Sequence, residues 1–498
     1  MGKYDVVIIG SGLGGLVCGY ILSKFGYKVC ILEQHTQIGG CLQTFRRSGV
    51  TFDTGMHYIG SLDPGQVLHT YFSYLGLLDT VPVRRLDESG FDTISLPQGD
   101  FKIPMGFSNF VEGLSAQFPH ERNNIETYVQ RIREVALESP LYNIQEIHEQ
   151  VFLNPHSVKS GVQEFMYGIS PNTVLQNVLL GNIPLYAGQR DKTPLYIHAL
   201  IHNFYIQSAY RLVGGSDSIA NSLAASIQIH GGEIYTKSQV AHIHCNAEKA
   251  VSVELSNGEI IHAESFISNM HPEVTLAKLN TPLIRKAYRE RVLNLENTIS
   301  NFTVYIVFKK NTVPYLNTNY YRYNTSDVWE CTDYKPQSWP MNFLYMHQAP
   351  ANNSKFAEGA LLIAYMKYDE VRQWENTTIG KRGDDYKAFK QEKSEKLLKA
   401  LEQSFPGIRS GIESYSSSTP LTYRDYTATK EGSMYGVVRD KNFPIQTLVS
   451  QRTRIPNLFM TGQNINSHGI LGVTIGSIIT CSEFLGINTI IKDIKDHI

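Results

Sequence analysis

The sequence predicts an α/β fold in which a nucleotide-binding domain of the Rossmann type is split along the chain and joined to an α+β domain. Three observations indicate this fold. A glycine-rich turn connects an apolar strand to an apolar helix at the N-terminus. A second strand and a glycine pair follow it, and a strand, a glycine and a long apolar helix recur near the C-terminus. At 498 residues the chain is long enough for two domains.

The first element is a βαβ unit. Residues 5–9 form an apolar strand, Gly10-Ser11-Gly12-Leu13-Gly14-Gly15 is a G-x-G-x-x-G turn, and the strand at 29–32 ends in Glu33, 18 positions after Gly15. The glycines permit a tight turn, close approach of a pyrophosphate, and close packing of helix on sheet. The helix N-terminus offers unpaired N–H groups to phosphates, and Glu33 accepts hydrogen bonds from a ribose 2′-OH. This unit predicts a bound dinucleotide.

A second motif follows soon after the first. Ile38-Gly39-Gly40-Cys41 comes directly after the βαβ unit, and Phe52-Asp53-Thr54-Gly55-Met56-His57-Tyr58-Ile59-Gly60 comes about a dozen residues later. The sequence and spacing of these motifs resemble those of the two-dinucleotide-binding-domain flavoproteins, the group of amine oxidases and carotenoid desaturases. Within that group they are most similar to the retinol saturase family, which borders the carotenoid isomerases and phytoene desaturases. The resemblance implies that the dinucleotide is FAD.

The C-terminal region is similar to the same family. Residues 456–464 (PNLFMTGQN) contain a strand that leads to Gly462, and Ser467-His468-Gly469-Ile470-Leu471 opens an apolar helix that runs to about residue 485. A helix that begins here would direct its N–H groups at the flavin N1 and C2 carbonyl. Such a helix would stabilise negative charge on the reduced flavin.

The middle of the chain supplies the rest of the nucleotide-binding domain. Arg211-Leu212-Val213-Gly214-Gly215 with Ser216 and Asp217 predicts a turn and a helix cap, followed by a helix over 218–230. Strands are predicted over 233–236, 239–245, 251–255 and 259–267. In the resembling family this stretch lies beside the adenine, which implies that Val240 binds it through its backbone.

These elements divide the chain into two discontinuous domains. The FAD-binding domain is predicted over 1–65, 205–275 and 410–498, and the substrate-binding domain over 66–204 and 276–409. The second domain carries helical patterns at 124–138 and 386–404 and aromatic strands at 302–308 and 359–368.

The motifs and the resemblance together give a set of FAD-binding residues, while the sequence predicts no metal site. The set is Gly10, Gly12, Leu13, Gly14, Gly15, Glu33, Gln34, Gly39, Gly40, Cys41, Thr54, Gly55, Met56, His57, Val240, Gly462, Gln463, Gly469, Ile470 and Leu471. For Cys41, packing is favoured over covalent attachment to the flavin.

Composition limits the partners. The net charge is −1 and the pI about 7.0, so nothing favours nucleic-acid binding. The six cysteines form no C-x-x-C pair, which predicts a reduced, cytoplasmic protein. No signal peptide or membrane span is predicted, although an apolar substrate would favour peripheral membrane contact. A mildly basic stretch of Arg372, Lys381, Arg382, Lys387 and Lys390 is expected to be a solvated face and is a weaker candidate for a lipid contact.

The source of electrons is left open by the sequence. No second G-x-G-x-x-G unit is present for NAD(P)H, and Gly214-Gly215 is not one because no strand precedes it in that pattern. Electrons therefore come either from NAD(P)H as a visiting reductant, or from a protein or quinone partner.

The family resemblance implies chemistry at a carbon–carbon double bond of an apolar polyene. The hypothesis is that hydride passes from reduced flavin to one carbon while an acid protonates the other. His57 and His468 are the candidates for that acid or for orienting groups, with Tyr58 and Tyr435 as weaker ones. Residues 419–426 and 432–436 also resemble the family and are expected at the substrate mouth.

Three functions compete for this sequence. The first is a reductase of the retinol saturase kind, acting on a retinoid-like or carotenoid-like polyene. The second is a flavin-dependent cis–trans isomerase of carotenoids, and an isomerase would share every motif above. A desaturase, which removes hydrogen and so catalyses the reverse of reduction, is a related alternative. The third, from another class, is a non-catalytic escort of prenylated partners without a flavin. Complete phosphate and ribose motifs favour the enzymes.

Overall fold

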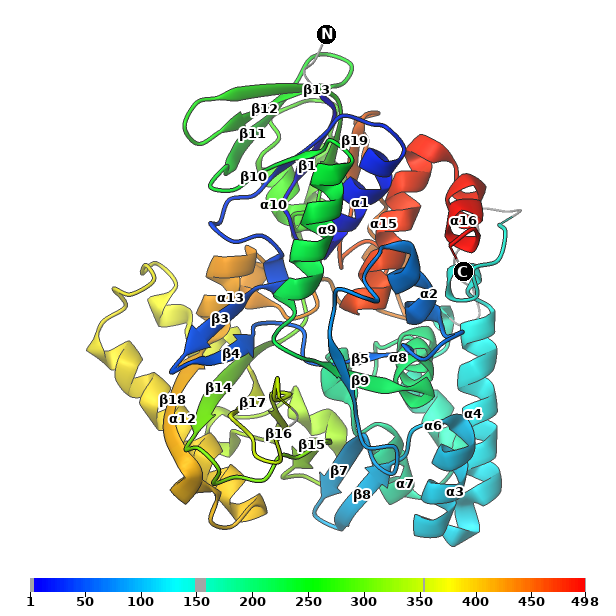
Figure 1. The fold of residues 1–498 in the computed structure, drawn as a ribbon, viewed down its shortest axis with the longest axis vertical. Helices are drawn as coiled ribbons and strands as arrows, with labels where there is room; N and C mark the ends of the chain where they lie inside the picture. The colour runs from blue at the N-terminus through cyan, green and yellow to red at the C-terminus, as the bar shows by residue number, and fades with distance from the viewer. Residues whose placement is uncertain (1–3, 148–157, 353, 498) are drawn as a thin grey trace.

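The computed structural model describes residues 4–147, 158–352 and 354–497. A seven-stranded sheet forms the upper half of Figure 1, with strand order β10-β2-β1-β13-β12-β11 and β19 paired with β13. Strands β10, β2, β1, β13 and β19 run parallel, while β11 and β12 are antiparallel additions. The strands are β1 (Tyr4–Ile9), β2 (Val29–Leu32), β10 (Glu233–Tyr235), β11 (Val240–Cys245), β12 (Ala250–Leu255), β13 (Ile260–Ser268) and β19 (Leu458–Met460).

Two mostly apolar helices lie against this sheet. They are α1 (Leu13–Lys24) and α15 (Gly469–Leu485), and both are buried along most of their length because apolar and small residues occupy nearly every face. Gly19 permits the close contact of α1 with the sheet, since a Cβ there would lie 2.7 Å from Ile31 Cδ1. Helices α9 (Asp217–Ile229) and α16 (Ile487–Lys495) complete this part. Segments from the start, middle and end of the chain thus share one core.

A second seven-stranded sheet, with order β18-β14-β17-β16-β15-β7-β8, forms the lower half. Its strands are β7 (Asp92–Leu96), β8 (Gly99–Ile103), β14 (Ser300–Phe308), β15 (Asn319–Tyr323), β16 (Asn342–His347), β17 (Gly359–Met366) and β18 (Ile412–Ser418). The helices around it are α3 (Phe107–Gln117), α4 (Arg122–Leu137), α6 (Val162–Ile169), α7 (Thr173–Leu179), α8 (Leu195–Gln207), α12 (Asp384–Ser404) and α13 (Pro420–Thr427).

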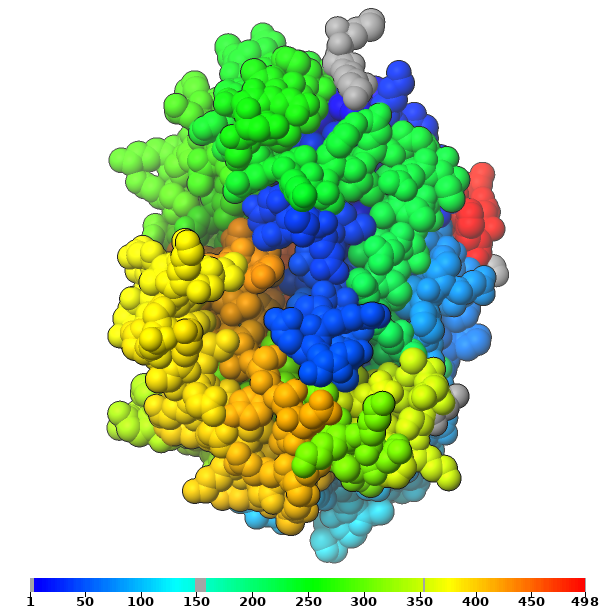
Figure 2. Space-filling model, turned by 60° about the vertical axis from the view of Figure 1, so that its left-hand side comes forward, coloured from blue at the N-terminus to red at the C-terminus, as the bar shows by residue number. Residues whose placement is uncertain are grey.

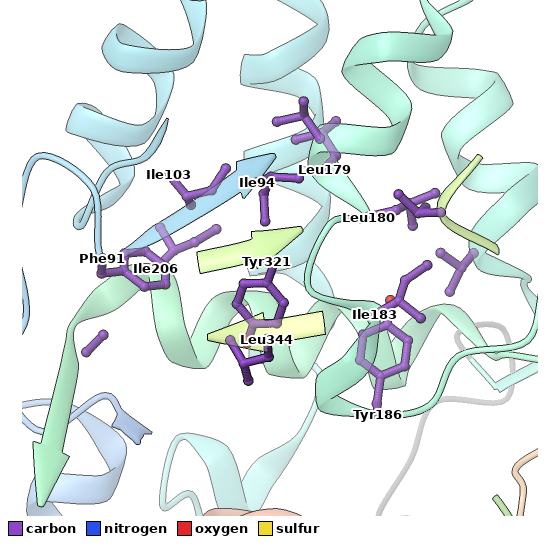
Figure 3. Close-up of a cluster of buried hydrophobic side chains, with 14 of the residues drawn as sticks. Phe91, Ile94, Ile103, Leu179, Leu180, Ile183, Tyr186, Ile206, Tyr321 and Leu344 are labelled. Carbon is purple, nitrogen blue, oxygen red and sulfur yellow. The ribbon is translucent and has the colours of Figure 1, made fainter. Parts of the chain in front are cut away.

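The core of this half lies between the sheet and helices of the N-terminal half of the chain. Figure 3 shows Ile94, Tyr321 and Leu344 from three neighbouring strands facing Leu179, Ile183 and Tyr186 from the α7–α8 region. Short sheets connect the two halves: β3 (Thr44–Arg47) with β4 (Val50–Asp53), and β5 (Ile59–Gly60) with β9 (Ala209–Leu212) and β6 (Val83–Arg85).

Most predicted elements are found within two residues of their expected bounds, among them both N-terminal strands, α9, α12, α15, β14 and β17. One detail was wrong. Ser216 precedes α9, but its hydroxyl donates to Leu42 O (3.1 Å) instead of capping the helix. The predicted domain boundaries stay predictions, and the strand after residue 410, β18, pairs with β14 in the second sheet.

Among the described residues, no single helix is long and apolar enough to cross a membrane. Only α15 and α16 together would have the length, and they are bent by 119° where they meet.

Candidate functional site

The two glycine motifs of the N-terminal segment are in direct contact. Gly39 forms a parallel bridge with Gly12, and its N–H donates to Ser11 O (3.0 Å). A Cβ on Gly40 would lie 3.1 Å from the Cα of Gly12. Motifs that are 24 residues apart in sequence therefore form a single surface at the N-terminus of α1. In Figure 2 this early part of the chain lies at the surface between segments from its middle and its end.

The glycines of the first motif leave no room for side chains. A Cβ on Gly15 would lie 2.1 Å from Gly10 O, and one on Gly14 would lie 2.9 Å from the backbone N of Gly462. Gly10 has φ +95°, which favours glycine. Leu13 is the first residue of α1, and Gly12 is its N-cap and offers no capping side chain. The first N–H groups of α1 therefore need acceptors from outside the helix.

Asn269 is a residue of this site to which the sequence analysis assigned no role. It follows β13, and the amide orientation that satisfies its polar atoms lets Oδ1 accept from the N–H groups of Gly12 (3.2 Å) and Gly15 (3.3 Å). It therefore caps α1 from a neighbouring strand. Only the adjacency of β1 and β13, which sequence does not show, brings Asn269 to this helix.

Glu33 lies at the end of β2, where the motif predicts the ribose. Its carboxylate accepts from Ser11 N (3.0 Å), Ser11 Oγ and His35 N (2.9 Å), which fixes its position and leaves lone pairs free. Gln34 beside it is exposed and contacts only His35 through its amide. The turn that leads to Val240 runs alongside, because Ser238 N donates to Glu33 O (2.7 Å). Glu33 and the start of β11 are thus neighbours.

Asp53 connects the second glycine motif to the turn at 214–216. Its Oδ1 accepts from the backbone N of Ser216 (2.7 Å), and the side chain is buried. Burial raises the pKa of this carboxyl to about 6, partly opposed by the hydrogen bonds from Ser216. The Phe-Asp-Thr-Gly motif therefore has a structural role, since Asp53 holds the second glycine motif to the turn at 214–216.

The pKa of Asp53 predicts a pH-dependent stability. Because the pKa of Asp53 in the folded protein is raised above 3.8, the protonated carboxyl contributes to the stability of the fold. This stabilisation is fully present below about pH 4 and is lost as the pH rises through about 6. We expect Asp53→Asn, which keeps an acceptor for Ser216, to stabilise the fold by about 2 kcal/mol at pH 7.5 and to have little effect at pH 4. Denaturant midpoints at the two pH values measure this difference in stability.

Asp53→Ala, which removes the acceptor for Ser216, is the control and should destabilise the fold at both pH values. A loss of stability for Asp53→Asn at pH 7.5 would contradict the prediction.

The remaining residues of the second motif face open space. Cys41 and Gly55 are exposed although they lie deep between the two halves, and a Cβ on Gly55 would meet Cys41 Cβ at 2.9 Å. Cys41 is therefore not a packed core residue, contrary to the favoured expectation; enclosure by the surrounding protein raises the pKa of its thiol. Thr54 Oγ1 donates to Gln43 O (2.8 Å), which fixes the loop, and Met56 follows as a cavity-lining residue.

The C-terminal residues close the site from the opposite side. Gly462 has φ +96° and lies against Gly14, Gln463 borders a small cavity, and Gly469, Ile470 and Leu471 begin α15. Arg439, which belongs to no sequence motif, is buried and donates through Nη2 to the carbonyls of Asn464 (2.8 Å) and Ile465 (3.1 Å). Arg439 therefore holds the loop between Gly462 and α15 and places a positive charge behind it.

An apolar cavity of about 130 Å³ lies where the glycine motifs, α15 and the second sheet meet. One wall is formed by 55–58 and by 467–472, and the opposite wall by apolar and aromatic side chains together with Asn342. Within the described parts of the chain, no Asp, Glu, Lys or Arg lines it. The opposite wall comprises Tyr142, Pro184, Leu185, Leu200, Ile201, Phe204, Tyr205, Asn342, Leu344, Met346, Ile363, Tyr365, Met434 and Tyr435.

Both candidate histidines line this cavity, although they are more than 400 residues apart in sequence. His57 Nδ1 is buried without a hydrogen-bond partner in the described structure, and enclosure lowers the pKa of this imidazole to about 4. His468 bonds Leu185 O through Nε2 (2.9 Å) and stacks on Tyr435 at 4.4 Å; burial lowers its pKa to about 4 as well. Both rings are therefore neutral at pH 7.

The two tyrosines are less suited to donate a proton. Tyr58 bonds the hydroxyl of Tyr321 (2.7 Å), and Tyr435 donates to Pro184 O (2.8 Å). Residues 432–436 reach the cavity through Met434 and Tyr435, as expected. Residues 419–426 do not line the cavity itself, and their place at the substrate mouth stays a prediction; α13 supports the site through Tyr423, whose hydroxyl donates to Thr54 O (2.6 Å).

These residues fit a flavin dinucleotide. The glycine loop and the N-terminus of α1 suit a pyrophosphate, Glu33 suits a ribose, and exposed Gly55 and Gly469 leave space for a flat ring beside the cavity. His57 lines this space, and its buried Nδ1 has no hydrogen-bond partner in the described structure. Within the described ranges, no three His, Cys, Asp or Glu side chains are grouped to hold a metal ion.

Comparisons with known proteins agree with this geometry. The chain is 29% identical to all-trans-retinol 13,14-reductase of Rattus norvegicus, over 97% of this chain and 86% of the relative. It is 24% identical to a chloroplastic prolycopene isomerase of Daucus carota, over 96% of this chain and 79% of the relative. Its fold is similar to that of an oxidoreductase from Methanosarcina mazei, with a TM-score of 0.64 at 17% identity, covering 95% of this chain and 99% of the other.

The model of one protein family matches residues 13–475, from the first helical residue of the glycine motif into α15. The match spans both halves of the fold and every segment that surrounds the cavity. The chain belongs to the flavin-containing amine oxidoreductase family.

Proposed function

We propose that this protein is an FAD-dependent oxidoreductase that saturates a carbon–carbon double bond of an apolar polyene, with a retinoid-like or carotenoid-like substrate. The observation that carries the proposal is the cavity between the glycine motifs and the second sheet. It is lined by apolar and aromatic side chains and contains no carboxylate. An oxidase of protonated amines would need an acceptor or an anion for its cationic substrate, whereas a conjugated hydrocarbon chain needs only a flat apolar slot.

The free volume of about 130 Å³ has room for a short stretch of conjugated chain. Two small cavities of about 30 and 20 Å³ share walls with it, one through Tyr435, Ser467 and His468 and one through Tyr142 and Leu200, and they would have to widen to hold the remainder of a polyene. This arrangement supports selection of one double bond, because residues 55–58 line the central cavity and neither of the two small ones.

Bound FAD would supply the hydride that reduces one carbon of the double bond. The chain's own residues hold the cofactor through the α1 N-terminus and Glu33, exclude water with the aromatic wall, and present His57 to the second carbon. A neutral imidazole can pass on a proton from Nδ1 or Nε2, and His57 has no other partner for Nδ1. Electrons for the next turnover come from NAD(P)H as a visiting reductant or from a protein or quinone partner. The likeness to carotenoid isomerases makes isomerisation the second candidate.

An anaerobic experiment tests the proposal. The purified protein is reduced with dithionite, and retinol, a carotenoid or an unsaturated lipid is added while flavin absorbance and product mass are followed. Reoxidation of the flavin with a product two hydrogens heavier is expected. A flavin that stays reduced while the product changes geometry at equal mass would make the protein an isomerase, and a colourless protein would revive the escort hypothesis.

A further inference from the structure

The loop formed by residues 443–448 exposes more apolar surface than its surroundings. Phe443, Ile445 and Leu448 have exposed fractions of 55, 84 and 37%, and Ile445 is the most exposed of the large hydrophobic side chains that the structure describes. The short helix α14 (Pro444–Thr447) presents them together. We call residues 443–448 the apolar loop. Clustered apolar side chains on a surface mark contact with a partner or a membrane.

The apolar loop is held firmly, so its exposure is a property of the fold. Arg439 donates to Thr447 O from inside the protein, and Arg291 of α11 (Lys286–Leu293) donates to the carbonyls of Gln446 (2.6 Å) and Leu448 (3.2 Å). Two further backbone contacts fix the preceding residues: Lys441 N donates to Lys192 O (2.8 Å), and Asn442 Nδ2 donates to Asp191 O (2.9 Å).

Two arginines and one carboxylate lie beside the apolar loop. Arg291 binds the carbonyls of the loop, Arg454 lies with it near Tyr288, and neither arginine forms a salt bridge within the described residues. Asp440 donates its backbone N–H to Thr447 Oγ1 (3.3 Å) and its carboxylate accepts from Asn442 N (2.8 Å), so two positive charges face one negative charge here. The basic stretch considered in the sequence analysis is different. Its Arg382 is buried against Asp425 and its Arg372 is paired with Asp369 and Glu431, so those charges are already compensated. An apolar projection with unpaired arginines beside it complements an anionic lipid surface.

The apolar loop is also continuous with the route to the cavity. Val437, Val438 and Arg439, directly before it, line the small cavity that His468 and Tyr435 share with the apolar one. That small cavity holds about 30 Å³ and shares Ala187 and Thr298 with an open cleft of about 960 Å³. Charged side chains line much of the cleft, among them Asp191 and Lys192, whose carbonyls bind the residues directly before the loop. A membrane in contact with the loop would therefore lie near the small cavity beside His468 and Tyr435, while the cleft stays open to water.

We infer that the apolar loop inserts into the interface of an anionic bilayer and holds the small cavity beside His468 and Tyr435 near the lipid surface. Membrane binding depends on the loop alone, whereas delivery of a lipid-dissolved substrate to the apolar cavity rests on the proposed function. Phe443 and Ile445 would enter the acyl boundary, while Arg291 and Arg454 contact lipid phosphates.

Co-sedimentation with vesicles tests the docking. The whole protein is mixed with vesicles of phosphatidylcholine alone or with a third of phosphatidylglycerol. We expect tighter binding to the anionic vesicles, and at least about tenfold weaker binding for Ile445→Asp, since an apolar contact is replaced by a charge. Ile229→Asp is the matched control, because Ile229 is 82% exposed at the end of α9 and should not affect binding. Arg454→Gln should reduce the preference for anionic vesicles.

Two outcomes would overturn the docking: wild-type protein that stays in the supernatant with both vesicle types, or equal losses for Ile445→Asp and Ile229→Asp. Delivery is tested by flavin reoxidation with a polyene held either in vesicles or in detergent micelles. Ile445→Asp should slow only the vesicle reaction, and equal rates in vesicles would refute delivery. Failure of the proposed function is distinguishable, because wild-type protein would then bind vesicles yet remain inactive on micellar substrate.

Discussion

Gly15→Ala is expected to yield a protein without flavin and with reduced stability. A Cβ at this position would lie 2.1 Å from Gly10 O, a backbone atom that cannot move without displacing β1 from α1. The same displacement would disturb the N–H groups that Asn269 and the N-terminus of α1 hold in place. Overpacking of this kind costs about 1–3 kcal/mol, and the loss of a tightly bound cofactor would lower the melting temperature further.

The measurement is the ratio of flavin to protein absorbance after purification, together with the melting temperature with and without added FAD. Gly168→Ala is the matched control, since Gly168 also lies in a helix, α6, and a Cβ there meets nothing within 4 Å. This control should retain its flavin and be as stable as the wild type or slightly more so. A yellow Gly15→Ala protein with wild-type occupancy would show that the glycine motif does not bind the cofactor.

The sequence predicted best those elements whose pattern of residues lies within one short segment of the chain. The strand, glycine turn, helix and acid of residues 5–33 depend on neighbouring residues, and so does the apolar run of α15. A local pattern can also predict the wrong hydrogen bond when a distant group accepts it. Ser216 fits the pattern of a helix cap, but its hydroxyl donates to Leu42 O instead of to its own helix.

The remaining parts of the site depend on contacts between distant segments. Asn269 caps α1 only because β13 pairs with β1, and Arg439 is important only because residues 464–466 fold over it. The apolar wall of the cavity combines the α8 region with β16 and β17, which meet through sheet pairing at long range. The spacing of apolar residues within one segment does not show which distant segment it will contact.

His57→Leu is expected to slow flavin reoxidation by substrate at least about a hundredfold while flavin occupancy stays unchanged, the range of a lost proton-transfer group. His57 faces the cavity with Nδ1 unpartnered, whereas His468 already bonds Leu185 O and stacks on Tyr435. His468→Leu should therefore cost less, and exposed His120→Leu should cost nothing. His57→Gln, which keeps a polar amide at the cavity, should recover part of the orientation but not the proton transfer.

The lowered pKa of His57 adds a test that a purely structural role would not pass. Because its folded pKa is about 4, the imidazole is neutral from about pH 5 upward, and the wild-type rate should show no titration from this group between pH 5.5 and 8. The unfolded chain takes up a proton near pH 6.5, so His57 reduces stability as pH falls from there towards 4, and His57→Leu should weaken that acid sensitivity. If both histidine variants reoxidise at the wild-type rate, the proton must enter by another route. The hydroxyls of Tyr58 and Tyr435 are committed to Tyr321 and Pro184, so that route would be water admitted through the cleft.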